Sequence, residues 1–214
     1  PGPGSSCRAT FSETNDATYC LGASRVRPIP DVYTDGMPQP DLSNHFLIAV
    51  PALDDPNFCG GVTLLCRHDA DGAMGILINR RSDIRLCDVF EQLGIEDCAG
   101  SLSAQHVLIG GPVHPERGFV LHADDGREWD SSFRVSDTVL LTTSRDILDA
   151  LARGQGPKRA VLALGCAGWG AGQLESELQD HAWLTAPASD ALIFDTPVAE
   201  RWQAAAHLLG VDLQ

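Results

Sequence analysis

AVLALGCAGWGAGQLESEL, residues Ala160 to Leu178, is the most informative segment of the sequence. Its apolar run breaks into glycines around one tryptophan and then becomes amphipathic. The residues from Val161 to Leu164 predict a buried strand. The glycines that follow predict a loop with positive φ angles or close backbone approach: Gly165, Gly168, Gly170 and Gly172. A helix is expected over residues 171–180.

A strand, a glycine loop and a helix in this order also build phosphate sites, but the side chains here do not fit one. A Walker-type loop needs Lys and Ser or Thr after its second glycine, whereas residues 165–170 are followed by Ala-Gly. The dinucleotide motif GxGxxG needs a third glycine where Gln173 stands. Glu175 and Glu177 would repel a phosphate. The sequence therefore favours a tight turn that packs Trp169 against the core, and no cofactor is expected.

Six ordered blocks carry a family pattern: NHFLIAVPALDDPNF (44–58), DGAMGILINR (71–80), IGGPVHPERGFVLH (109–122), LTTSRDILDALARGQGP (141–157), LGCAGWGAGQLESEL (164–178) and FDTPVAERW (194–202). With them the chain resembles the bacterial YqgE/AlgH family from about Leu42 to Leu213. Two departures are Cys166, where members more often carry Tyr, and the Cys-Gly-Gly at 59–61. A thiol-based role therefore lies outside the shared pattern.

The resemblance implies an α+β fold: a single domain with a mixed or antiparallel branched sheet, a small barrel-like part and flanking helices. It implies no established catalytic activity. The transcriptional regulator label attached to the AlgH name rests on a genetic association and supplies no mechanism.

The apolar pattern along the chain agrees with a mixed fold. Strands are expected near 45–50, 62–67, 74–79, 105–109, 118–122, 138–142, 160–164 and 191–195, and helices over 86–93, 145–153, 171–180 and 197–209. Thr143 or Ser144 is the expected N-cap of the second helix, and Thr196 followed by Pro197 begins the last. Several strands follow one another without a helix between them, so the sheet cannot be purely parallel.

Residues 1–40 are rich in proline, show no sustained periodicity and lie outside the resemblance, so an extension is expected there and the domain over 41–214. Met37 stands directly before MPQPDLSNHF, the family-like start. Two alternatives stay open: Met37 is the natural initiator and residues 1–36 lie upstream of it, or Met37 is an internal methionine.

Charge excludes several classes of function. The chain has 29 acidic and 15 basic residues, a formal net charge of −14. Direct nucleic-acid binding is not expected, because the densest basic cluster, Arg80, Arg81 and Arg85, is interrupted by Asp83 and is typical of a solvated face. No apolar run approaches a membrane span and no signal segment opens the sequence. No membrane association and a cytoplasmic location are therefore expected.

The cysteines are odd in number and irregularly spaced, which predicts reduced thiols: Cys7, Cys20, Cys59, Cys66, Cys87, Cys98 and Cys166. Cys66 and Cys87 lie in apolar segments and are expected to be buried. No CxxC or HExxH motif occurs, and Cys59, Cys66 and His68 come nearest to a cluster, so no metal is expected. Three scattered histidines are expected to be structural: His45, His114 and His122.

No catalytic set is evident in the sequence. There is no GxSxG motif. The pairs Asp54/Asp55 and Asp124/Asp125 stand in turn sequences, DDP and ADDG, where Asp favours the backbone geometry. Solvated turns are thus favoured over an acid/base pair, and the catalytic residues, if any, are unassigned.

The segment GGPVHPERGF, residues 110–119, is the remaining candidate. Its glycines and prolines shape a loop that carries His114, Glu116 and Arg117. An arginine in such a loop can bind a carboxylate or phosphate with two hydrogen bonds, although an internal ion pair is its commoner use.

Two hypotheses of different class remain. The first is a non-enzymatic binding or regulatory module for a protein partner or a small anionic ligand, acting through two loops: Gly110, Gly111, His114, Arg117, Gly168, Trp169 and Gly170. If the strands before these loops are neighbours, Trp169 and Arg117 face one pocket; the alternative is that Trp169 fills the core and Arg117 pairs internally. The second is an enzyme of unrecognised type, a hydrolase or a thiol-dependent protein, using His114 or Cys166. The sequence fixes neither the ligand nor the oligomeric state.

Overall fold

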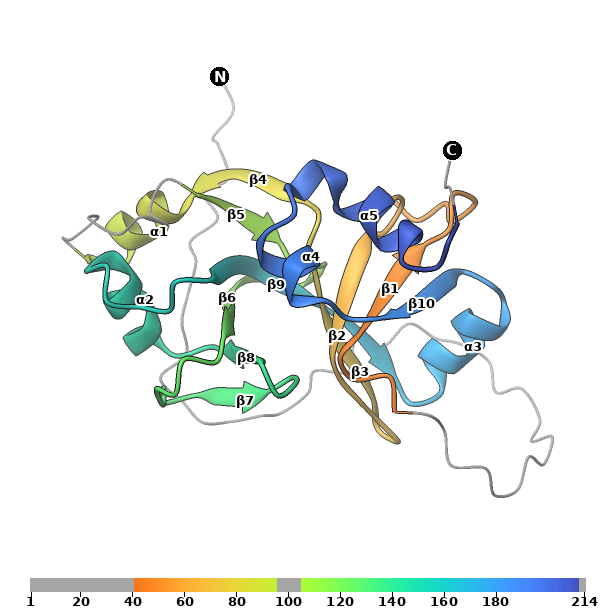
Figure 1. Cartoon of the computed structure of the whole chain (residues 1–214), viewed down its shortest axis with the longest axis horizontal. Helices are drawn as coiled ribbons and strands as arrows, with labels where there is room; N and C mark the ends of the chain where they lie inside the picture. The colour runs from red at the N-terminus through yellow and green to blue at the C-terminus, as the bar shows by residue number, and fades with distance from the viewer. Residues whose placement is uncertain (1–40, 96–104, 212–214) are drawn as a thin grey trace.

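Strand β9 (Ala160–Gly170) is the centre of the fold, and the sheet is built around it (Figure 1). The computed structural model describes residues 41–95 and 105–211. The expected extension, residues 1–40, lies outside the described residues, as do Cys7, Cys20 and Cys98.

The described residues form a ten-stranded sheet in the order β10-β1-β2-β3-β9-β6-β8-β7, and β5 joins β4 to it through β9. Every pairing is antiparallel except that of β5 with β9. The strands are β1 (His45–Ala49), β2 (Val62–Asp69), β3 (Gly72–Leu77), β4 (Arg81–Arg85), β5 (His106–Ile109), β6 (Val113–Ala123), β7 (Ser132–Arg134), β8 (Val139–Thr142) and β10 (Trp183–Pro187).

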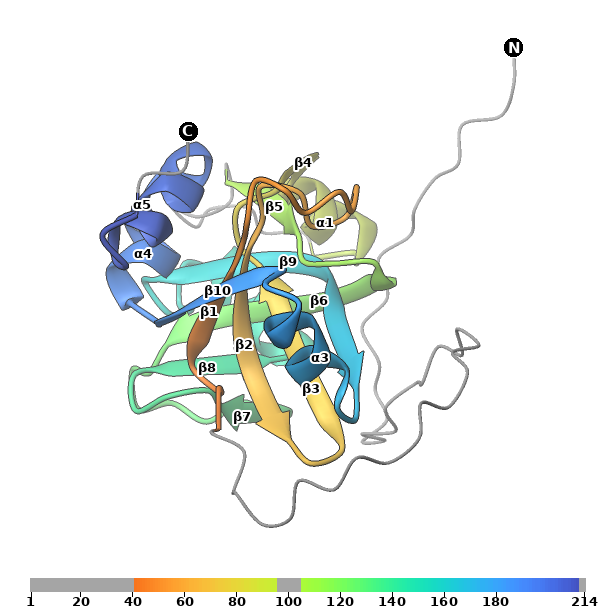
Figure 2. The same ribbon diagram turned by 90° about the vertical axis from the view of Figure 1, so that its right-hand side faces the viewer.

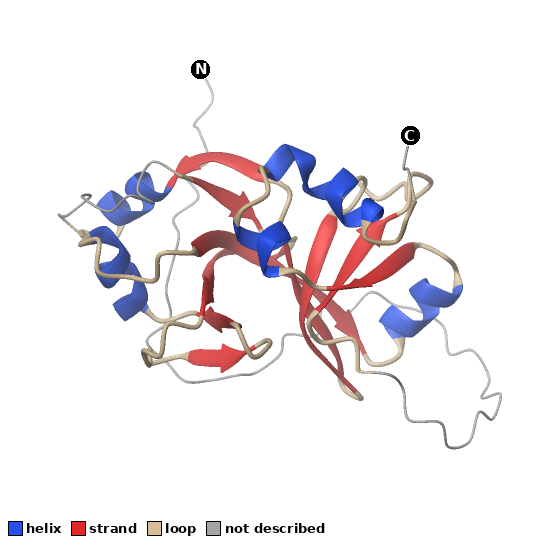
Figure 3. Ribbon diagram, in the orientation of Figure 1, coloured by secondary structure: helices blue, strands red, loops and turns tan. Residues whose placement is uncertain are grey.

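The branch arises because β9 serves two groups of strands. Its first half pairs with β5 and β6, and its second half pairs with β3. Figure 3 shows the strands as one curled layer with the helices outside it. The predicted fold class, an α+β domain with a mixed, branched, partly barrel-like sheet and flanking helices, is confirmed.

The helices cover the sheet at three places. Helices α1 (Leu86–Gln92) and α2 (Arg145–Ala152) pack on each other beside β4, and α3 (Gln173–Gln179) packs on β3, β9 and β10. Helix α4 (Asp190–Phe194), a 3₁₀ turn (Val198–Glu200) and α5 (Arg201–His207) follow, and α5 packs on β1 and β2 (Figure 2). No helix in the described part of the chain has the length and apolar character needed to cross a bilayer.

The buried side chains form three clusters. One joins the sheet to α4 and α5 and includes Phe46, Cys166 and Ile193. A second lies under α1 and α2. The third lies under α3 on the other face of β9 and contains Trp169. The two faces of β9 therefore bury different clusters, as alternation along a strand requires.

The glycine-rich stretch is a strand and not a loop, which corrects the sequence expectation for residues 165–170. Positive φ angles occur at Gly165 and at Gly172, and α3 begins at Gln173 rather than at residue 171. The reason is a close approach of two backbones: a Cβ on Gly110 would lie 2.2 Å from the Gly165 carbonyl oxygen, and one on Gly111 would lie 2.3 Å from that of Cys166. Here the glycines permit contact between strands and do not form a turn.

Residues 191–195 are also different from the prediction, since α4 replaces the expected strand. An apolar run this short does not distinguish a strand from a buried helical turn. Strands β4, β7 and β10 were not expected; β4 and β7 are polar or exposed along their length, so they lack an apolar pattern. The other seven expected strands correspond to β1, β2, β3, β5, β6, β8 and the first half of β9.

The helix starts are partly as predicted. Ser144 precedes α2, but its hydroxyl donates to the Asp146 carboxylate at 2.6 Å and caps no backbone N–H. The last helix begins later than expected, because Pro197 is followed by the 3₁₀ turn and α5 starts only at Arg201.

Candidate functional site

The two glycine segments do meet, but backbone packs against backbone. The Gly110 N–H donates to the Leu164 carbonyl at 2.7 Å, and its own carbonyl accepts from the Leu77 N–H at 2.8 Å. Gly111 lies against Cys166 and is buried. Gly168 is exposed and pairs with Met74 on β3. This junction is filled by main chain.

Trp169 lies in the core. Its side chain is only 6% exposed and packs against Phe58 and Trp183, with ring centroids 6.0 and 6.1 Å away. Its indole N–H donates to Glu177 Oε2 at 2.9 Å, and the Trp183 indole donates to the same oxygen at 2.8 Å. The Gly170 N–H donates to Gln173 Oε1 at 3.1 Å. Trp169 thus fills the core, which is the first half of the second alternative; its other half, an internal ion pair of Arg117, is not seen among the described residues.

Arg117 belongs to the other side of β9. Its charge acts on the Cys166 thiol, and Cys166 is three positions from Trp169 along a regular strand, so the two point to opposite faces. Arg117 is half-buried and has no hydrogen bond or ion pair to any residue in the described ranges. His114 adopts a φ of 49°, and its Nδ1 lies 3.4 Å from Glu116 Oε1.

The thiol of Cys166 is not activated. Burial raises the pKa of this thiol to about 11, although the Arg117 charge acts in the opposite direction. Cys66 is fully buried as well, and burial raises its pKa further. Since the thiolate is the nucleophile, neither cysteine is suited to thiol chemistry at neutral pH. Cys87 is half-buried, less than the sequence predicted.

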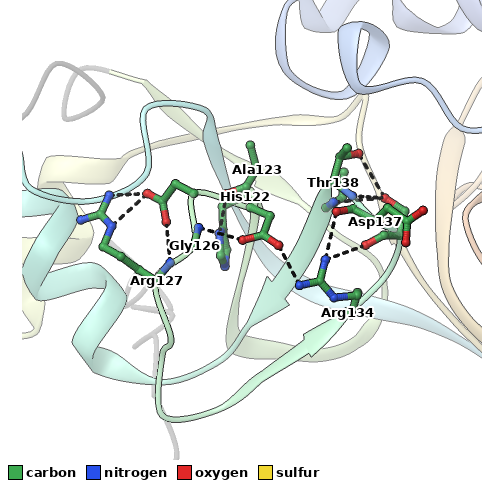
Figure 4. A network of polar contacts seen from close by, with 11 residues as sticks. His122, Ala123, Gly126, Arg127, Arg134, Asp137 and Thr138 are labelled. Carbon is green, nitrogen blue, oxygen red and sulfur yellow. Dashed lines mark hydrogen bonds and ion pairs between the residues drawn. The ribbon is translucent and has the colours of Figure 1, made fainter.

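Asp124 and Asp125 lie in a turn, as predicted, and Figure 4 shows their partners Gly126, Arg127 and Arg134. Asp124 accepts from the Gly126 N–H at 2.9 Å and pairs with Arg134 at 2.7 Å, and Asp125 pairs with Arg127. These contacts hold the pKa of each carboxyl below its usual value, so both are ionised and share no proton.

The histidines also have structural partners. His122 donates from Nδ1 to the Ala123 carbonyl at 3.1 Å and accepts from the Thr142 hydroxyl at Nε2, 2.8 Å away; burial lowers its pKa. His68 accepts from the Leu42 N–H and donates to Glu175 at 2.8 Å. Within residues 41–95 and 105–211, no three His, Cys, Asp or Glu side chains gather as metal ligands would.

A pocket that the sequence did not reveal opens between the β4–β5 pair, the start of β9 and the segment from α4 to α5. Its volume is about 720 Å³. Four of the chain's cations line it: Arg81, Lys158, Arg159 and Arg201. His106 and one carboxylate, Asp195, line it too. We call this set of residues the basic pocket.

Arg201 is the most unusual member of the basic pocket. It is only 4% exposed, yet it makes no ion pair with a carboxylate in the part of the chain that the structure describes. Its Nε donates to the Thr196 carbonyl at 3.0 Å and its Nη1 to the Ile78 carbonyl at 2.6 Å. Burial lowers its pKa to about 10, so the side chain stays charged at neutral pH. A buried charge without a partner is costly, which makes this position a candidate anion site.

Arg159 is held beside it. Its guanidinium lies 5.0 Å from the centroid of the Phe194 ring and donates to the Asp190 carbonyl at 3.1 Å and to the Asp195 carboxylate. Its Nε–H is buried without an acceptor among the described residues. His106 donates from Nδ1 to the Ser82 carbonyl at 3.0 Å.

Sequence reasoning missed this pocket because its cations come from three separate places in the chain: Arg81, the pair Lys158 and Arg159, and Arg201. Of the basic trio, only Arg81 lines it; Arg80 donates to the carbonyls of Pro56 and Cys59, and Arg85 pairs with Asp88. One signal was available: Arg201 lies three positions after Val198 and four before Ala205, so it falls on an apolar face of the last predicted helix. A buried face that contains a lone arginine predicts either a partner or a site.

Comparison with known proteins gives consistent results. The family model described as AlgH-like, DUF179, matches residues 46–214. A UPF0301 protein of Xanthomonas campestris pv. campestris (strain B100) is 58% identical over 177 residues, which cover 83% of this chain and 93% of that protein. A UPF0301 protein of Stenotrophomonas maltophilia (strain K279a) is 57% identical over 172 residues, 80% of this chain and 91% of that protein.

Solved structures agree. The solution structure of the AlgH protein from Pseudomonas aeruginosa is 44% identical, superimposes with a TM-score of 0.70, and covers 86% of this chain and 95% of that one. A crystal structure of a Corynebacterium diphtheriae protein shares the fold at 21% identity and a TM-score of 0.63, over 80% of this chain and 88% of that one. The matched residues include β9 and the segment from α4 to α5, so the chain belongs to the AlgH-like family.

Proposed function

We propose that this protein is a non-enzymatic binding or regulatory module of the cytoplasm, and that it takes a small anionic ligand in the basic pocket. The observation that carries the proposal is Arg201, a buried cation whose polar contacts in the described structure are main-chain carbonyls. Carbonyl oxygens orient the guanidinium without neutralising it. An anion in the pocket would supply the missing charge.

The charge balance of the pocket supports the same conclusion. Four cations and one carboxylate line it, although the whole chain has a net charge of −14. Positive charges that line one pocket repel one another, and a bound anion would relieve that repulsion. A volume of about 720 Å³ also lies in the usual range for small-molecule sites.

An enzymatic function has less support. A hydrolase or thiol-dependent enzyme needs a nucleophile within hydrogen-bond reach of a base, and Cys166, the thiol considered, is held protonated by burial. His114 contacts Glu116, not a nucleophile. The Arg117 segment remains a second candidate location for an anion or a protein partner, because Arg117 lacks an ion pair in the described structure.

Calorimetric titration with pyrophosphate at low ionic strength tests the proposal. The double variant Arg81→Ala/Lys158→Ala should weaken binding by about tenfold or more, since both side chains lie on the exposed rim and each removes one charge near the ligand. Arg145→Ala is the matched control, an exposed arginine paired with Asp149 on α2, away from the pocket. Binding that is lost with Arg117→Ala and kept in the double variant would move the site to the glycine segments. No binding to the wild-type chain would refute an anion site.

A further inference from the structure

We propose that the ligand of the basic pocket is an organic diphosphate: a diphosphate group joined to an apolar or aromatic body. This inference rests on the proposed function and adds the chemical class of the ligand. Two observations carry it, the excess of positive charge and the apolar residues that line the same pocket.

The first observation concerns the number of charges. Arg81, Lys158, Arg159 and Arg201 supply four positive charges and Asp195 removes one, which leaves three. A carboxylate ligand would neutralise one of them. A diphosphate ester carries about three negative charges at neutral pH, because its terminal phosphate is close to doubly ionised and the inner phosphate adds one. The pocket therefore matches a diphosphate better than a carboxylate.

The geometry of the arginines agrees with a ligand of several oxygens. Arg201 uses Nε and Nη1 on carbonyls, and its Nη2 has no hydrogen bond in the described structure. The Arg159 Nε–H also lacks an acceptor among the described residues. Planar guanidinium groups bind phosphate with paired hydrogen bonds, whereas a lysine such as Lys158 acts as a point charge.

The Asp195 carboxylate pairs with Arg159 where we expect a ligand anion to bind. It pairs with the guanidinium, but its side chain is 59% exposed, and an ion pair this exposed contributes little. A phosphate with two or more charges can displace it. Arg159 then becomes available without loss of its contact with the Phe194 ring.

The second observation concerns the rest of the lining. Val161, Phe194 and Val198 are partly exposed and present apolar surface in the same pocket. Inorganic phosphate or pyrophosphate would leave that surface wet, whereas an organic body would bury it. Phe194 with Arg159 over its ring also gives a flat platform, the arrangement on which bases and other planar groups stack.

Nucleoside diphosphates and isoprenoid diphosphates share this chemistry, so the experiment uses one of each. Calorimetric titrations of the full chain would compare ADP, geranyl diphosphate, pyrophosphate and citrate at one low ionic strength. We expect at least one organic diphosphate to bind about tenfold tighter than pyrophosphate, and citrate to bind more weakly than either. The tighter of the two organic probes identifies the source.

Variants separate the two parts of the ligand. Phe194→Leu should reduce the ratio of organic-diphosphate affinity to pyrophosphate affinity, and Arg81→Ala/Lys158→Ala should weaken binding of both. Arg145→Ala should change neither. A far-ultraviolet circular dichroism spectrum and a melting curve for each variant show whether it is folded.

The outcomes distinguish the two proposals. Equal affinity for pyrophosphate and both organic diphosphates would contradict the proposal that the ligand has an apolar or aromatic body. If citrate binds more tightly than every diphosphate probe and the double variant weakens its binding, the ligand is not a diphosphate but the anion site stands. Failure of all four probes to bind would overturn both.

Discussion

Replacing Glu177 by leucine should destabilise the protein strongly, because one carboxylate oxygen satisfies two buried indole groups. Glu177 Oε2 accepts from the Trp169 indole at 2.9 Å and from the Trp183 indole at 2.8 Å. Both tryptophans are nearly inaccessible, at 6% and 5% exposure. Leucine has a similar volume and helix propensity, so besides this acceptor the change removes only the exposed hydrogen bond that Gln173 Nε2 donates to Glu177 Oε1 at 3.0 Å.

The magnitude follows from the two donors. A buried donor left without an acceptor costs roughly 1–3 kcal/mol, so two give about 2–5 kcal/mol of lost unfolding free energy when some relaxation is allowed. The matched control is Glu177→Gln, whose amide oxygen can still accept from both indoles. Its expected cost is about 1 kcal/mol, the difference between a charged and a neutral acceptor.

Urea unfolding followed by far-ultraviolet circular dichroism measures both variants, because tryptophan fluorescence would respond to the substitution itself. If Glu177→Leu unfolds within about 0.5 kcal/mol of the wild type, the carboxylate is not the link between the two tryptophans. A loss for Glu177→Gln equal to that for leucine would show that charge matters and the shared acceptor does not.

Three further predictions concern charge. Asp195→Asn should tighten pyrophosphate binding by about two- to fivefold in calorimetry, because it removes the carboxylate that competes for Arg159; weaker binding would contradict this. Burial lowers the pKa of His122 below its usual 6.5, so its contribution to stability is present above pH 6.5 and is lost as the pH falls through the folded value. Melting temperatures at pH 7.5 and 5.5 should therefore fall less in His122→Gln than in the wild type, and an equal fall would assign the effect elsewhere. The wild-type chain should show no salt-sensitive affinity for duplex DNA at physiological ionic strength in a gel-shift assay, since its net charge is −14.

The apolar alternation of the chain predicted most strands. Where the predicted element was wrong, the cause is a contact with residues distant in the sequence. Residues 165–170 look like a loop because glycine has low strand propensity, but the cost of glycine in β9 is offset by the approach of Gly110 and Gly111. Contact between strands distant in sequence is not encoded in a local pattern. The same holds for α4, whose four apolar residues fit either element until the neighbouring layer is known.

The candidate site was predicted less well than the fold, and the reason differs from one group of residues to the next. The local sequence identified Arg117 and His114 as candidate ligand contacts. That role stays a prediction. Trp169 was found as well, and the fold gives it the structural role. The basic pocket escaped notice because Arg81 and Arg201 are separated by most of the domain and line one pocket only in the folded chain, where α5 packs on β1 and β2.

The acidic exterior and the basic pocket are two parts of one electrostatic arrangement. A net charge of −14 repels a long polyanion over about one Debye length, which is roughly 8 Å at physiological ionic strength. A small anion that enters the pocket comes within contact distance of Arg201 and Arg159, where the local field of three excess positive charges exceeds the screened repulsion of the surface. The charge that argues against nucleic-acid binding therefore does not argue against a diphosphate. Selection by size follows directly: a small ligand fits inside the pocket, while a duplex would have to lie along the acidic surface around it.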